Sequence, residues 1–185
     1  IAFLVPLGLL VRGIAEDRAL DAAERAADAL VPTLALRLDP EALQATVDGL
    51  LARAQAGEIQ AVGITGKPFI FAVGADLSGV PYVTDREQAV SIARAGHAAF
   101  ASIMDLPVPT FAFVNGAAMG GGVEIALACD YRTVSAGVPA FALPETFLGL
   151  VPGWGGCYLL PNLIGPADAL TVIVANPLSQ NRMLK

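Results

Sequence analysis

Residues 115–124 read NGAAMGGGVE, and this glycine-rich stretch decides the fold class of the chain. It follows the apolar run 110–114, which the proline-rich residues 107–109 separate from a long helical pattern, and which we expect to form a strand. The glycines predict a flexible turn, residues 123–129 have helical character, and residues 130–135 favour a strand again. The order strand, glycine turn, helix, strand is typical of an α/β fold with crossover connections.

The flanking sequence supplies further signals for where helices begin and end. Asp39 and Pro40 offer an N-cap acceptor and a first-turn proline, so a helix is expected to begin there and to stop near Gly57. Thr84 and Glu87 have capping-box spacing and predict the start of a helix that runs to about residue 104. Further elements are expected at 16–30 (helix), 59–65 and 69–71 (strands) and 167–174 (helix).

The composition indicates one globular domain and excludes several functions. Of 185 residues, 55% are hydrophobic, and 11 Lys and Arg stand against 17 Asp and Glu, a net charge of -6 that disfavours nucleic acid as a partner. The apolar opening at residues 1–11 is about half the ~20 residues of a membrane-spanning helix, so no membrane is expected. Cys129 and Cys157 are interpreted as reduced thiols in a cytoplasmic protein. The single histidine, His97, excludes a multi-histidine metal site and is assigned a structural role.

Three common active-site signatures are absent from the sequence. A phosphate loop ending at Gly66 would need glycine at Ala61 and Ser or Thr at Pro68. The glycines of 116–122 do not satisfy G-x-G-x-x-G, and there is no G-x-S-x-G nucleophile elbow. No nucleotide cofactor and no serine hydrolase chemistry are therefore predicted.

Two isolated carboxylates stand out in uncharged sequence. Glu124 is the only acid between Leu106 and Cys129, and Glu145 is the only acid between Thr133 and Ala167. An apolar environment raises the pKa of a carboxyl toward neutrality, which suits general acid–base catalysis. The alternative interpretation is that Glu124 pairs with a backbone group and that Glu145 lies on a surface turn.

The glycines provide a second possible catalytic element. A run such as 120–122 at a helix start lets backbone N–H groups approach a ligand oxygen, and residues 74–76, after the strand expected at 69–71, offer another N–H. Two converging donors make an oxyanion hole, which stabilises negative charge on a carbonyl oxygen. Ordinary tight turns are the alternative.

These stretches together resemble the enoyl-CoA hydratase/isomerase (crotonase) superfamily. The resemblance covers about residues 34–185 and looks most like the hydratase portion of bacterial multifunctional fatty-acid oxidation proteins, which carry a 3-hydroxyacyl-CoA dehydrogenase segment downstream. It rests on 71–77, 115–124, 128–132, 143–145, 148–153 and 160–165. It implies a crotonase-type α/β superhelix of repeated β-β-α units in one domain at 34–185, incomplete at its C-terminus, with 1–33 an atypical N-terminal segment.

The resemblance also implies roles for individual residues. Glu124 and Glu145 would be the catalytic acid/base pair, and the N–H groups of Ala75 and Gly121 would form the oxyanion hole. The acyl-CoA binding residues would be Ala75, Asp76, Leu77, Ser78 and Gly121. No metal and no separate cofactor are implied, because CoA is part of the thioester substrate. A trimer-type homo-oligomer is expected for the full-length protein.

The expected activity is that of an enoyl-CoA hydratase, the reversible syn addition of water to trans-2-enoyl-CoA in fatty-acid β-oxidation. A Δ3,Δ2-enoyl-CoA isomerase and an inactive acyl-CoA-binding fragment are the alternatives. Having both carboxylates favours hydration, because isomerases of the family often keep just the second. The sequence leaves open which glutamate is the acid and which the base.

Overall fold

A computed structural model describes residues 40–74 and 83–175, and in this part of the chain six strands form two parallel sheets. Each sheet has three strands. The first contains β1 (Val62–Thr65), β3 (Thr110–Val114) and β5 (Tyr131–Val134), in that order. The second contains β2 (Phe69–Val73), β4 (Gly116–Met119) and β6 (Phe141–Ala142), in that order.

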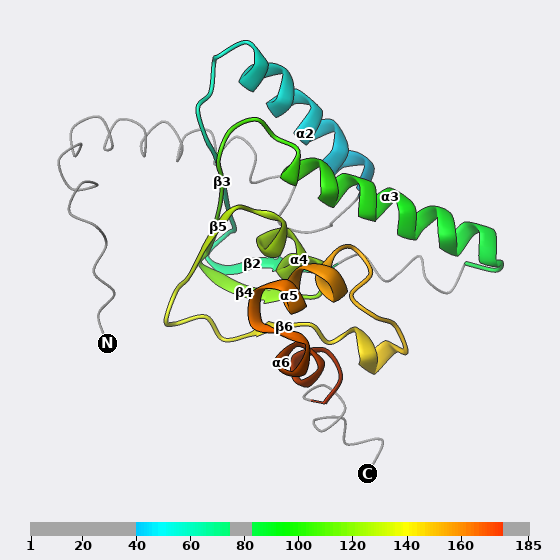
Figure 1. The fold of residues 1–185 in the computed structure, drawn as a ribbon. Helices are drawn as coiled ribbons and strands as arrows, with labels where there is room; N and C mark the ends of the chain where they lie inside the picture. The colour runs from blue at the N-terminus through cyan, green and yellow to red at the C-terminus, as the bar shows by residue number, and fades with distance from the viewer. Residues whose placement is uncertain (1–39, 75–82, 176–185) are drawn as a thin grey trace.

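The two sheets are built by alternation along the chain. Each consecutive pair of strands sends its first member to one sheet and its second to the other, and a helix then returns the chain to the next pair. That helix is α3 (Arg86–Met104) after β2 and α4 (Gly121–Ala128) after β4. Figure 1 shows the crossovers that make all the pairings parallel. The repeated β-β-α units expected from the sequence are therefore confirmed.

A single asparagine links the two strand-to-strand turns at which the chain passes between the sheets. The side-chain oxygen of Asn115, between β3 and β4, accepts a hydrogen bond from Gly66 N at 3.0 Å. Its Nδ2 donates to Gly66 O at 2.8 Å. Because Gly66 lies between β1 and β2, this amide holds equivalent turns of successive repeats together.

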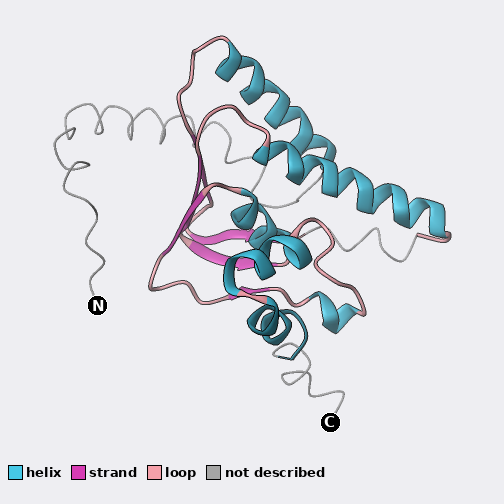
Figure 2. Ribbon diagram, in the orientation of Figure 1, coloured by secondary structure: helices cyan, strands magenta, loops and turns pink. Residues whose placement is uncertain are grey.

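The remaining helices flank the strands (Figures 1 and 2). The helix α2 (Pro40–Gln55) lies beside α3 and buries Leu43 and Val47. After β6 come a 3₁₀ turn, η3 (Glu145–Leu148), then α5 (Gly156–Ile164), α6 (Pro166–Leu170) and the π-helical turn η4 (Thr171–Ala175). Both α4 and α6 contact α5, so the C-terminal helices lie next to the buried helix of the core.

The helix starts agree with the sequence signals, with one shift of register. Pro40 begins α2, and Gly57 with φ +71° follows its end, as predicted. The capping residue of α3 is Asp85, whose carboxylate accepts a hydrogen bond from Gln88 N at 2.8 Å. The prediction of a capping box at Thr84 was wrong by one residue, because Asp85 and Gln88 have the same spacing and aspartate is an equally good cap.

Three elements of the second half were not predicted. Residues 116–119 form β4 rather than a turn, because they pair with β2 on one side and β6 on the other. Both β6 and α5 were missed, and α5 carries Pro161 within it. The helix expected over 167–174 is divided between α6 and η4.

The centre of the molecule is α4, in which all eight residues are buried. A Cβ added to Gly122 would lie 2.0 Å from the carbonyl oxygen of Ala72 in β2, so glycine is required for α4 to approach the sheet. At the other end of the helix, Arg132 Nε donates to Ala126 O at 3.0 Å and so satisfies a carbonyl group of the last turn. The position of α4 is thus fixed at both ends.

The Gly122→Ala substitution tests this packing. We expect it to lower the free energy of unfolding by about 1–3 kcal/mol, because the added methyl group meets backbone rather than a movable side chain. The control is Gly49→Ala on the exposed side of α2, where nothing lies within 4 Å and alanine should stabilise by up to ~1 kcal/mol. Urea unfolding of both variants makes the measurement, and equal stabilities would contradict the close approach of α4 to β2.

Candidate active site

The carboxylate of Glu124 is buried in α4 and held by two backbone donors. Its residue is 2% exposed. Its Oε1 accepts hydrogen bonds from Trp154 N at 2.8 Å and from Gly156 N at 2.9 Å. Trp154 precedes α5 and Gly156 is its first residue, so both donors belong to the segment 152–156, called the turn below, where the chain enters α5. The interpretation that Glu124 pairs with backbone groups is therefore correct as a contact. The carboxylate lies where α4, which carries it, meets Trp154 and the start of α5.

Opposing effects act on the pKa of Glu124. Burial raises the pKa above its ordinary value, while the N–H groups of Gly156 and Trp154 lower it, and the charge of His97 lowers it further. The effect of burial is the largest, so the pKa is raised overall. Glu124 is thus a carboxylate whose proton affinity depends on the position of a neighbouring turn.

The second carboxylate, Glu145, begins η3 and is half-buried. Its Oε2 is buried and has no hydrogen-bond partner among the described residues. Burial raises its pKa to about 7, its own backbone N–H lowers the pKa, and the charge of Glu124 raises it. A carboxyl that is half protonated at neutral pH is able both to give and to take a proton.

Both carboxylates lie at the N-terminal end of α4. Gly120, the N-cap of this helix, has φ 56°, and a Cβ there would lie 2.8 Å from Glu145 Oε1. A Cβ on Gly156 would lie 3.1 Å from Glu124 Oε1. Glycine is needed at both positions because side chains would fill the space that the carboxylates occupy. Glu124 thus lies close enough for its charge to raise the pKa of Glu145.

Gly121, the candidate oxyanion-hole residue, is the first residue of α4. The first N–H groups of a helix have no carbonyl partner within it and carry the positive end of the helix dipole. Its neighbour Gly120 uses its own N–H on Ala142 O at 2.9 Å. The structure therefore brings Gly121 to the same helix end as Glu124 and Glu145.

Four other predicted site residues, Ala75, Asp76, Leu77 and Ser78, lie outside the described residues. The Cα of Gly74, which precedes them, lies 3.8 Å from the position that a Cβ on Gly120 would occupy. The end of β2 therefore lies next to the start of α4, on the side of the sheet where the carboxylates are found.

Two residues near the site were not assigned to it from sequence. His97, on α3, has Nδ1 3.4 Å from Gly153 O, and its charge acts on Glu124. The Cys157 thiol has a raised pKa, because burial and the charges of Glu124 and Glu145 all disfavour the thiolate. Neither residue carries a motif, and only the folded turn at 152–156 brings them near the carboxylates.

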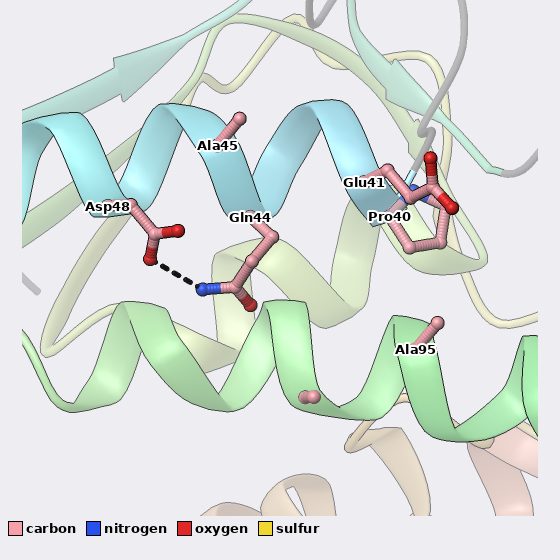
Figure 3. A pocket seen from close by; sticks show the side chains of 7 residues that line it. Pro40, Glu41, Gln44, Ala45, Asp48 and Ala95 are labelled. Carbon is pink, nitrogen blue, oxygen red and sulfur yellow. Dashed lines mark hydrogen bonds between the residues drawn. The ribbon is translucent and has the colours of Figure 1, made fainter.

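A separate cavity of about 370 Å³ lies between α2 and α3 (Figure 3), and neither Glu124 nor Glu145 lines it. Two of the residues that line this cavity are joined by a hydrogen bond, which Gln44 Nε2 donates to Asp48 Oδ1 at 2.9 Å. Its lining residues are Pro40, Glu41, Gln44, Ala45, Asp48, Ala95 and Ala98. This lining is mostly apolar, and its two acidic residues, Glu41 and Asp48, both belong to α2.

Residues 40–74 and 83–175 contain no group of three or more His, Cys, Asp or Glu side chains arranged to hold a metal ion. Within the same residues, no helix is both long and apolar enough to span a lipid bilayer.

Comparison with known proteins assigns the family. The family model described as enoyl-CoA hydratase/isomerase matches residues 32–180. The alpha subunit of the fatty acid oxidation complex of Idiomarina loihiensis is 44% identical over 114 residues, which are 61% of this chain and 16% of the relative. The corresponding subunit of Shewanella loihica is 39% identical over 123 residues, 66% of this chain and 17% of the relative. The chain therefore spans about a sixth of the length of these curated relatives.

Solved structures agree with this assignment. Pseudomonas aeruginosa DspI is 36% identical with a TM-score of 0.69, over 77% of this chain and 58% of that one. An enoyl-CoA hydratase from Bacillus anthracis is 32% identical with a TM-score of 0.65, over 76% and 54%. The chain belongs to the enoyl-CoA hydratase/isomerase family, and its fold is the crotonase type that the sequence resemblance implied.

The protonation of Glu145 predicts a pH-dependent stability. The folded state raises the pKa of this group from 4.5 to about 7, so the folded state binds its proton more tightly than the unfolded state does. Stability from this group is therefore present below pH 4.5 and is lost as pH rises through about 7.

Glu145→Gln removes that loss. We expect the variant to be more stable than wild type by on the order of 1–3 kcal/mol at pH 8, and by much less at pH 4.5. Glu87→Gln, an exposed acid on α3, controls for the removal of one negative charge. Urea unfolding at the two pH values makes the measurement, and an equal gain at both would contradict the raised pKa.

Proposed function

We propose that this chain carries the active site of an enoyl-CoA hydratase, which adds water reversibly across the C2–C3 double bond of a trans-2-enoyl-CoA. The observation that supports it is the pair of carboxylates at one helix end, Glu124 held by two N–H donors and Glu145 with a buried oxygen that has none. Family membership and the similarity to the Bacillus anthracis enoyl-CoA hydratase agree with this chemistry.

The contacts suggest how the two carboxylates divide the work. N–H donors stabilise an ionised carboxylate, so Glu124 is suited to accept a proton from water. An oxygen without a donor favours the neutral acid, and Glu145 has a pKa of about 7, so it is suited to give a proton. We therefore assign Glu124 as the base and Glu145 as the acid in the direction of hydration.

In the proposed reaction, the oxygen of water adds to C3 of the enoyl group and a proton adds to C2. An O–H bond of water breaks, its proton goes to Glu124, and the oxygen forms a bond to C3 of the enoyl group. The electrons of the double bond move toward the thioester oxygen as an enolate, and C2 takes the proton of Glu145. Exchange with solvent returns both carboxyl groups to their starting states. No redox cofactor or metal takes part in this scheme.

The developing negative charge on the thioester oxygen requires donors. We assign one to the N–H of Gly121 at the start of α4, where the helix dipole adds to the effect. The second is assigned to Ala75, with the acyl-CoA contacts at Asp76, Leu77 and Ser78, on the basis of the family resemblance.

The carboxylate pair is tested by substitutions that keep shape and remove proton exchange. Glu124→Gln and Glu145→Gln should each lower kcat/KM for hydration by at least about 100-fold, because one carboxyl accepts a proton from water and the other gives a proton to C2 in the same reaction. The double variant should lose little more than either single variant. The loss of absorbance of the conjugated enoyl thioester measures the rate in the full-length protein, with Glu87→Gln as the control.

The same assay separates the alternatives. A Δ3,Δ2-enoyl-CoA isomerase would form the conjugated absorbance from a 3-enoyl-CoA, and Glu145→Gln would be crippling while Glu124→Gln was mild. An acyl-CoA-binding protein would neither consume nor produce the absorbance. Wild-type hydration rates in Glu124→Gln would contradict the hydratase assignment.

Gly121→Pro tests the oxyanion hole. It deletes the N–H at the first position of a helix, where the fixed φ of proline suits the helical backbone. We expect kcat to fall by about 10²–10³-fold while the fold persists. Gly121→Ala keeps the N–H and should retain far more activity, so equal losses in the two variants would remove this N–H from the mechanism.

A further inference from the structure

The turn at residues 152–156 is the source of both N–H groups that hold Glu124, so whatever fixes this turn also fixes the carboxylate. Inside the turn, Pro152 is buried, and a Cβ on Gly156 would lie 2.6 Å from the Pro152 Cβ. Cys157 N donates to Pro152 O at 3.1 Å. These contacts shape the turn but do not attach it to the rest of the molecule.

The attachment to α3 is made by Trp154. A Cβ added to Gly96 would lie 2.2 Å from Cε2 and Nε1 of the indole, so the ring lies directly over the glycine. The ring also packs against Phe100 with centroids 5.2 Å apart. On the same helix, His97 Nδ1 approaches Gly153 O at 3.4 Å. α3 therefore contacts the turn at Gly153 and Trp154.

Trp154 thus contacts α3 with its side chain and Glu124 with its backbone. Movement of the indole moves the N–H that it carries, and the N–H of Gly156 lies two residues further along the same turn. Hydrogen bonds weaken steeply with distance and angle, so a small displacement of the turn weakens both.

We propose that Trp154, lying over Gly96, is a positioning residue that holds the carboxylate of Glu124 in its reactive orientation. The inference rests on the proposed function, in which Glu124 is the base. It assigns to Gly96 and Trp154 a role through Glu124 and no contact with substrate.

The charged and titratable groups around Glu124 come from three elements. His97 acts from α3 and lowers its pKa, while Glu145 of η3 and Cys157 of α5 are coupled to it by charge. The two backbone donors also lower the pKa. Displacement of the turn weakens these donors, so the pKa of Glu124 rises and the base becomes protonated at a higher pH.

The experiment is a double-mutant cycle with Gly96→Ala and Trp154→Ala in the full-length protein. The added methyl group meets the indole, a side chain that is able to move, so the Gly96→Ala protein should fold. We expect its hydration kcat to fall at least about tenfold with KM little changed, and the acidic limb of its pH profile to move to higher pH. In the Trp154→Ala background, Gly96→Ala should have no further effect, because the clash is gone.

Controls and a second variant keep the outcome decisive. Gly49→Ala, on the exposed side of α2, should leave kcat and the pH profile unchanged in both backgrounds. If Trp154→Ala does not fold, Trp154→Phe replaces it, and the Gly96→Ala effect should shrink with the smaller ring. An unchanged kcat and pH profile in a folded Gly96→Ala protein would overturn the inference, as would an equal Gly96→Ala effect with and without the indole.

Titration of the Glu124 side chain by carboxyl ¹³C NMR separates this inference from the proposed function. We expect Gly96→Ala to raise the pKa of Glu124 whatever substrate the enzyme takes. An inactive wild type with this shift would contradict the hydratase proposal alone. An active wild type in which Gly96→Ala leaves the titration unchanged would overturn the positioning role alone.

Discussion

A carboxylate removed from water needs hydrogen-bond donors inside the protein, and this requirement organises the centre of the molecule. Glu124 lies in a helix with no exposed residue, and its donors are 30 and 32 residues away along the chain. The turn that supplies them must therefore pack against α4, and α5 begins where the second donor, Gly156, lies. The turn and the first residue of α5 are thus held next to α4 by hydrogen bonds to one oxygen.

Glycine makes these close approaches possible. At Gly122 the start of α4 contacts the backbone of β2, at Gly120 it makes room for Glu145, and at Gly96 α3 receives an indole ring. In each case the space that a side chain would fill is taken by a group from another element. The result is a site in which glycines lie directly beside both carboxylates, and in which a buried oxygen of Glu145 has no donor among the described residues.

The sequence predicted the repeat and the carboxylates better than it predicted the contacts. The strand at 110–114 was recognised because prolines precede it, whereas 116–119 was interpreted as a turn because its glycines and alanines have low strand propensity. Pairing with β2 and β6 overrides that propensity. The lack of other charges singled out Glu124 and Glu145 as candidate catalytic residues, and that role stays a prediction. Which backbone groups hold Glu124 escaped prediction, because N–H donors 30 and 32 residues away carry no residue signature.

The alternation of strands between two sheets also has a consequence for how the chain folds during synthesis. All the pairings are parallel and join strands from successive repeats, so neither sheet gains a partner strand until the next repeat has been made. Such non-local contacts slow folding because the intervening chain must be ordered first. Each repeat leaves two strand edges to be covered by the next, and Asn115 holds the turns of the first two described repeats together in the folded chain. Growth from the ribosome and growth of both sheets therefore proceed in the same direction.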